Sequence, residues 1–129
     1  MSGGVSVRAE FAYVGSDGRW GQVRVEIGWF ADDPHAVSLW FVRQDKLWSC
    51  GRELLFDALT SDGAGEGDVR FRRSEHEGYV AMVLDSPHGH AELLVPREDL
   101  IEVLALSEPL FRPAVDAWRD TIRPEAVTT

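Results

Sequence analysis

The sequence predicts an α+β domain built from two antiparallel β-sheets with helices packed against them. The first half alternates apolar and polar residues with a period of two, and the period changes to that of a helix at 52–60. The same order then returns. The pattern Arg-Glu-x-Leu-apolar-acid-small-Leu occurs at 52–59 and again at 97–104. This echo indicates two β-β-β-α units related by a pseudo-repeat.

The first half is expected to contain strands 5–13, 23–29, 36–43 and 46–50, followed by the helix 52–60. Residues 15–18 and 32–35 predict turns, because Gly, Asp and Pro stand where turn geometry favours them. The strand at 36–43 is apolar on both faces, so both faces must be covered.

The second half is expected to repeat this scheme. It begins with a flexible acidic loop at 61–67 and continues with strands 68–73, 79–84 and 90–95. Residues 86–89 fit a type I turn. A helix should run from Pro96 or Arg97 to about 106, and a separate C-terminal helix should open at Arg112. We expect a single domain over 1–129, with frayed ends at about 1–4 and 125–129.

Length and charge exclude several classes of protein. The chain has 129 residues with 22 acidic and 13 basic side chains, and its formal net charge of −9 disfavours nucleic acid and anionic membranes. It shows no apolar run long enough for a membrane span and no signal peptide. One cysteine excludes an internal disulfide. We therefore expect a cytoplasmic protein.

Four sequence features invite a chemical interpretation, and each has a simpler structural one. His88 and His90 have the spacing of metal ligands, but the sequence offers no third ligand. Cys50 precedes a helix, yet no cysteine-histidine signature surrounds it. Asp32 and Asp33 suit a turn, and the glycines of 63–67 lack the Lys and Ser/Thr of a phosphate loop. We predict no catalytic, metal or cofactor site.

Two surface features point to binding. Arg70, Arg72 and Arg73 surround Phe71, as in a single-strand nucleic-acid binder, but a solvated strand face is the favoured interpretation. The chain also has five tryptophans, more than a core of this size accommodates. We therefore predict an oligomer or partner surface. Its candidate residues are Trp40, Val42, Val80, Met82, Leu84 and Trp20.

Arg52 and Arg97 hold equivalent places where a strand turns into a helix. An arginine at a helix N-terminus opposes the helix dipole unless something compensates it. We expect each guanidinium to pair with a carboxylate or to cap nearby carbonyl groups.

An ordered set of motifs resembles the actinobacterial sporulation and cell-division regulators typified by SsgA and SsgB. The motifs stand at 33–37, at Trp48 with 52–55, at 65–70 and at 86–91, and the resemblance covers about residues 5 to 120. From these motifs we assign structural roles to Pro34, Trp48 and Asp68. The sequence departs from the family pattern at His35, where a tyrosine is expected, and at 49–51.

The resemblance implies a non-catalytic regulator that positions or assembles the division ring at sporulation septa. The implied partners are the tubulin-like protein FtsZ or its recruiters. It also implies a homo-oligomer akin to the trimeric SsgB type, with a fold that looks like the Whirly class of single-strand nucleic-acid binders. The alternative function is therefore a Whirly-like single-stranded nucleic-acid-binding protein. A small hydrolase or metal protein is a third possibility.

Overall fold

The computed structural model describes residues 3–15, 17–87 and 89–122. Its strands are β1 (Gly4–Val14), β2 (Trp20–Phe30), β3 (Ala36–Phe41), β4 (Lys46–Gly51), β5 (Gly63–Glu66), β6 (Val69–Arg73), β7 (Tyr79–Ser86) and β8 (Gly89–Pro96). Helix α1 (Arg52–Thr60) lies between β4 and β5, and α2 (Arg97–Ile122) follows β8. Each half of the chain thus contains four strands and then a helix, and the second half has one strand, β5, more than predicted.

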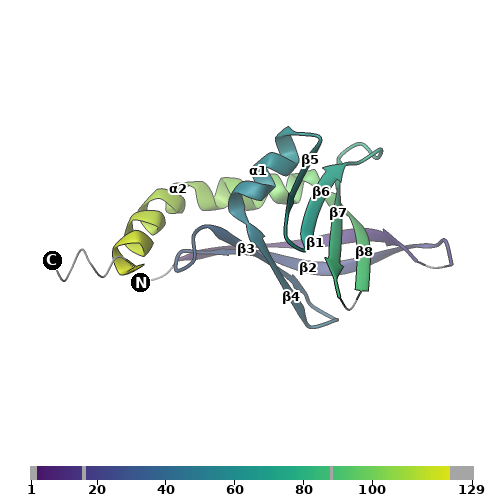
Figure 1. Cartoon of the computed structure of the whole chain (residues 1–129), viewed down its shortest axis with the longest axis horizontal. Coiled ribbons are helices and arrows are strands. Elements are labelled where there is room, and N and C mark those ends of the chain that lie inside the picture. The colour runs from purple at the N-terminus through teal and green to yellow at the C-terminus, as the bar shows by residue number, and fades with distance from the viewer. Residues whose placement is uncertain (1–2, 16, 88, 123–129) are drawn as a thin grey trace.

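The strands form one sheet and not the two that the sequence predicts. The order across it is β4-β3-β2-β1-β8-β7-β6-β5, with every neighbouring pair antiparallel. The two four-stranded halves are joined by one ladder pair, Ala12 with Leu94. Figure 1 shows the halves crossing steeply at this junction, with the β1–β2 hairpin running on past β8.

The core lies between the inner face of this curved sheet and the two helices. Alternate residues of β1 and β2 point into it, and Phe11, Val25, Ile27 and Trp29 are fully buried. The helices add Leu55 and other apolar side chains from one face each. Each such side chain contributes about 1.5–3 kcal/mol when it leaves water, so the period-two pattern of the sequence is what fixes the register of these strands.

Three local predictions need correction. The expected acidic loop contains β5, which pairs with β6 from Gly63–Arg72 to Glu66–Val69. The two expected C-terminal helices are one helix, α2, with Pro109 and Pro113 inside it. At the N-terminus Gly4 already belongs to β1, and the Gly3 carbonyl accepts a hydrogen bond from the Ala31 N–H. Residues 1–2 and 123–129 lie outside the described chain.

Helix α2 continues through its prolines but bends. An interior proline removes one helical N–H and crowds the preceding turn. Figure 1 shows the C-terminal part of α2 turned away from its first half. Near its N-terminus, burial raises the pKa of Asp99, and neighbouring Glu98 and Glu102 add to the shift. The folded chain therefore holds a proton on Asp99 more tightly than the unfolded chain does, and that contribution to stability is lost as the pH rises through the shifted pKa.

Within the described residues, neither helix combines the length and the apolar character that crossing a membrane requires.

Candidate functional site

Arg52 is buried at the junction of the two helices, where α1 begins. Its side chain is only 5 % exposed. The Nε group donates to Ser107 Oγ at 3.1 Å, and Nη2 donates both to the Leu104 carbonyl at 3.2 Å and to Glu108 Oε2 at 3.0 Å. The guanidinium thus meets a carboxylate and also caps a carbonyl group, and these contacts compensate its burial.

Aromatic rings enclose the same guanidinium. Its central carbon lies 4.3 Å from the centre of the Phe111 ring and 5.3 Å from that of Phe56. The Phe111 ring in turn meets His35 edge-on at 5.7 Å, and His35 meets Trp118 at 5.2 Å. The main chain closes this arrangement, because the Arg52 N–H donates to the His35 carbonyl at 2.8 Å. The arginine therefore binds the turn before β3, helix α1 and the bent part of α2 into one unit.

Arg97 forms the reciprocal contact at the other end of α1. Its Nη2 donates to the Leu59 carbonyl at 3.1 Å, in the last turn of α1. A cation is favourable there, because helix carbonyls present partial negative charge at a C-terminus. The first residue of each helix thus binds the other helix, and α1 runs antiparallel to the first half of α2.

Pro34, Trp48 and Asp68, the other residues with a predicted structural role, make contacts with the core or the sheet. The Pro34 carbonyl accepts a hydrogen bond from Nε1 of the buried Trp29 at 2.8 Å. Trp48 is half-buried and packs against the core. The Asp68 carbonyl accepts from the Asp85 N–H at 2.9 Å and so extends the ladder between β6 and β7.

The outer face of the first half of the sheet carries the exposed aromatic candidates. Trp40 is 38 % exposed and stands beside Leu47 across the β3–β4 ladder, while Val42 is half-buried. Trp20 is 57 % exposed at the end of the β1–β2 hairpin, where its ring meets His76 edge-on at 5.5 Å. These positions leave Trp40, Val42 and Trp20 available to a partner.

Val80, Met82 and Leu84 are not on an open face, contrary to the sequence prediction. All three are at most 4 % exposed and belong to the core between the sheet and the helices. The opposite face of β7 is also covered, since Ala81 and Val83 stand beside Arg72 and Arg70 in the β6–β7 ladder. Long arginine stems cover apolar surface well. The chain itself therefore covers both faces of this strand, and these three residues leave the candidate surface.

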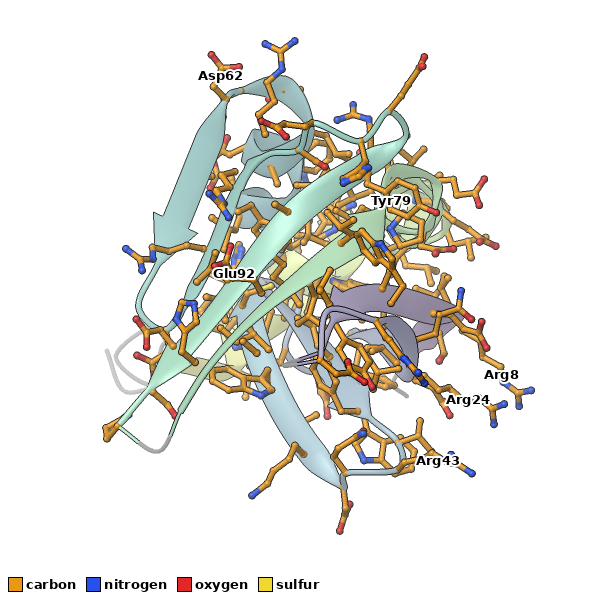
Figure 2. All side chains as sticks on the ribbon, turned by 90° about the vertical axis from the view of Figure 1, so that its right-hand side faces the viewer. Arg8, Arg24, Arg43, Asp62, Tyr79 and Glu92 are labelled. Atoms are coloured by element: carbon orange, nitrogen blue, oxygen red, sulfur yellow. The ribbon has the colours of Figure 1, made fainter. Side chains whose placement is uncertain are left out.

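The basic cluster of β6 is neutralised by carboxylates. Arg70 pairs with Asp85 at 3.7 Å, Arg73 pairs with Asp62 at 3.5 Å, and Arg72 pairs with Glu92. Figure 2 shows Glu92 beside the strands of this half and Asp62 at its far end. Each arginine thus has a partner that competes with phosphate, which argues against this face as a nucleic-acid site.

The candidates for chemistry are dispersed. Cys50 is a buried core residue, and Asp32 and Asp33 lie in the turn between β2 and β3. His90 contacts Asp85 and Glu92 at 3.7 and 3.5 Å, whereas His88 lies outside the described residues. In the described part of the chain no three His, Cys, Asp or Glu residues are grouped to hold a metal ion.

Known proteins share this fold. A solved chain from work on SsgB mutations and longitudinal cell division during sporulation of Streptomyces coelicolor superposes with a TM-score of 0.75 and 30 % identity. The match covers 85 % of this chain and 88 % of that one. The SsgA-like sporulation-specific cell division protein of Thermobifida fusca gives 0.71 at 20 % identity, over 93 % and 94 %. The fold is therefore that of the SsgA-like proteins.

Sequence comparison gives the family. The family described as Streptomyces sporulation and cell division protein, SsgA, matches residues 23–113. Sporulation-specific cell division protein SsgB of Salinispora tropica is 34 % identical over 107 residues, which is 78 % of this chain and 74 % of that protein. SsgB of Frankia casuarinae is 35 % identical over 77 residues, or 56 % and 53 %. The chain belongs to the SsgA family, as its motifs predict.

Arg52 and Arg97 should both contribute to the stability of the folded chain. Arg52→Ala should lower the free energy of unfolding by about 1–3 kcal/mol, because it removes a buried charged donor together with its hydrogen bonds to Ser107, the Leu104 carbonyl and Glu108. Arg97→Ala, which loses one carbonyl contact, should have a smaller effect. Urea midpoints measure both, with the exposed Arg112→Ala on α2 as the control. Unchanged midpoints for Arg52→Ala and Arg97→Ala would show that neither arginine holds the helices together.

Proposed function

We propose that this protein is a non-catalytic regulator of sporulation-specific cell division. It acts through protein–protein contacts that position or assemble the division ring at septa. The observation that carries the proposal is membership of the SsgA family over residues 23–113, together with relatives named as sporulation-specific cell division proteins. The proposed partners are FtsZ or the proteins that recruit it. The protein works in the cytoplasm, is recruited to septa and requires no cofactor.

The surface supports protein partners over nucleic acid. The formal net charge is −9, and the arginines of β6 are paired with carboxylates. Binding to DNA depends on the number of phosphates that free cations neutralise. Protein contacts need exposed aromatic anchors instead, and Trp20 and Trp40 meet that requirement.

A homo-oligomer, with three copies as in the SsgB type, is part of this proposal. Trp40, Val42 and Leu47 together give the outer face of β3 and β4 an apolar patch. Burial of one such tryptophan contributes about 2–3 kcal/mol at an interface.

Sedimentation equilibrium at micromolar concentration tests the oligomer. We expect a mass above the 14.4 kDa of one chain and dissociation in Trp40→Ala. Ile101→Ala, which truncates a comparably exposed residue on α2, is the control and should leave the mass unchanged. A wild-type protein of 14.4 kDa at every concentration would exclude self-association.

Co-sedimentation with FtsZ filaments tests the function, beside fluorescence anisotropy with labelled single-stranded DNA at physiological salt. We expect the protein to pellet with filaments and to bind DNA only weakly, since its basic cluster is neutralised. Submicromolar DNA binding without filament contact would contradict the proposal and favour the Whirly-like alternative.

A further inference from the structure

The sheet opens where β1 leaves β8. The two strands share the single pair Ala12–Leu94 among the described residues, and residues 89–92 of β8 are exposed. A cavity of about 650 Å³ lies at this divergence. It is lined by the end of the β1–β2 hairpin, including Tyr13 and Trp20, by residues 90–94 of β8, and by Arg72 of β6, Ala81 of β7 and His76 in the loop between them. We call this space the β8 cleft.

The direction of the β8 main chain follows from its pairing with β7. The Arg97 N–H donates to the Gly78 carbonyl at 2.9 Å, which continues the β7–β8 register. Hydrogen-bonded and non-hydrogen-bonded pairs alternate along an antiparallel ladder. The pairs 84–91 and 82–93 are therefore hydrogen-bonded, whereas 85–90 and 83–92 are not. The main-chain N–H and C=O groups of His90 and Glu92 consequently point away from β7, toward the side that β1 has left.

The exposed edge of β8 is suited to binding another extended strand. Peptide groups that point outward from a strand are met best by another extended backbone. From Gly89 to Leu93 the edge is about 17 Å long, enough for a segment of about five residues. The side chains of an added strand would alternate between the two sides of the sheet, so that one set meets the exposed indole of Trp20.

We propose that the β8 cleft binds an extended segment of a partner protein, which adds as a strand along residues 89–93. This inference rests on the proposed function, because it locates one of the protein contacts through which the regulator acts. The segment has apolar side chains on the side that meets Trp20, and its backbone pairs with His90 and Glu92.

The surroundings of the cleft favour one isolated strand over other occupants. The β1–β2 hairpin runs past β8 (Figure 1), and its end lines the cleft, so this confined edge suits a single strand better than the sheet of a second copy. Nucleic acid is disfavoured because Asp85 and Glu92 flank the edge and Arg72 is paired with Glu92.

The test uses a fluorescent seven-residue probe, Lys-Val-Thr-Val-Thr-Val-Lys, whose binding is followed by anisotropy. We expect saturable binding to the full chain. His90→Pro should weaken it by about tenfold, since proline removes one N–H that faces the cleft and none that faces β7. Trp20→Ala should weaken it similarly.

Two control variants distinguish loss of a main-chain hydrogen bond at the β8 edge from effects of the side chain or of folding. His90→Ala keeps the main-chain N–H and should bind like the wild type. Ser49→Pro removes an outward-facing N–H from β4, at the far edge of the sheet, and should also leave binding unchanged. The urea midpoint of each variant checks that it folds, and edge strands accept proline at such positions.

Hydrogen exchange supplies a second readout that does not depend on a variant. On addition of the probe, the amides of His90 and Glu92 should become protected, while those of Ala91 and Leu93, which face β7, should change little. No saturable binding up to about 1 mM probe would overturn the proposal. Ser49→Pro weakening probe binding as much as His90→Pro would also overturn it. So would protection of the His90 and Glu92 amides when the protein concentration is raised without probe, because that result would assign the cleft to a second copy.

These outcomes are independent of the test of function. Wild-type protein that binds the probe but does not pellet with FtsZ filaments contradicts the proposed partner and leaves the cleft intact. If the wild type and His90→Pro pellet equally well with filaments and neither binds the probe, the proposed binding at the β8 cleft is contradicted. The proposed function is then unaffected.

Discussion

A single buried charge, the guanidinium of Arg52, holds the helical layer together. Taking such a charge out of water costs several kcal/mol, roughly, unless its hydrogen bonds are met. Here Ser107, the Leu104 carbonyl and Glu108 meet them, and Phe111 covers one face. These acceptors lie just before Pro109, the first proline inside α2. The contact therefore fixes this part of α2 at the start of α1, and Arg97 fixes the end of α1 to the start of α2.

This helical layer determines which surfaces remain for partners. Both helices lie against the inner face of the sheet, as Figure 1 shows, and they enclose the apolar residues of β7 in the core. The outer face of the second half is covered by paired arginines and carboxylates. The surfaces that stay open among the described residues include the aromatic surface around Trp40, the hairpin end with Trp20, and the edge of β8. All three suit contacts with proteins better than contacts with phosphates.

The sequence predicts most elements because their signals are local. Alternation and turn signals place seven of the eight strands to within a few residues, and helix 52–60 is recovered with its bounds. The contacts of Arg52 and Arg97 also follow from local reasoning, because a cation at a helix N-terminus needs a compensating partner. The motifs identify the family for the same reason: each is a short segment with its own spacing.

The sequence-based predictions are wrong where the structure depends on contacts between residues that are distant in the sequence. The strand Gly63–Glu66 has two glycines and no alternation, so only its pairing with β6 makes it a strand. An interior proline normally ends a helix, yet α2 continues through Pro109 and Pro113. It is contacted there by Arg52, which lies over fifty residues earlier in the chain. One pair, Ala12–Leu94, merges two expected sheets into one. The β8 cleft arises from that same junction, so no local pattern reveals it.

We propose that this chain works at the division septum through its surface. The most direct measurement follows a fluorescent fusion of the full chain, by time-lapse microscopy, in a sporulating actinobacterium that also carries labelled FtsZ. We expect regularly spaced bands that coincide with FtsZ rings as septa form. Diffuse fluorescence throughout sporulation, or fluorescence that follows the nucleoids, would contradict it.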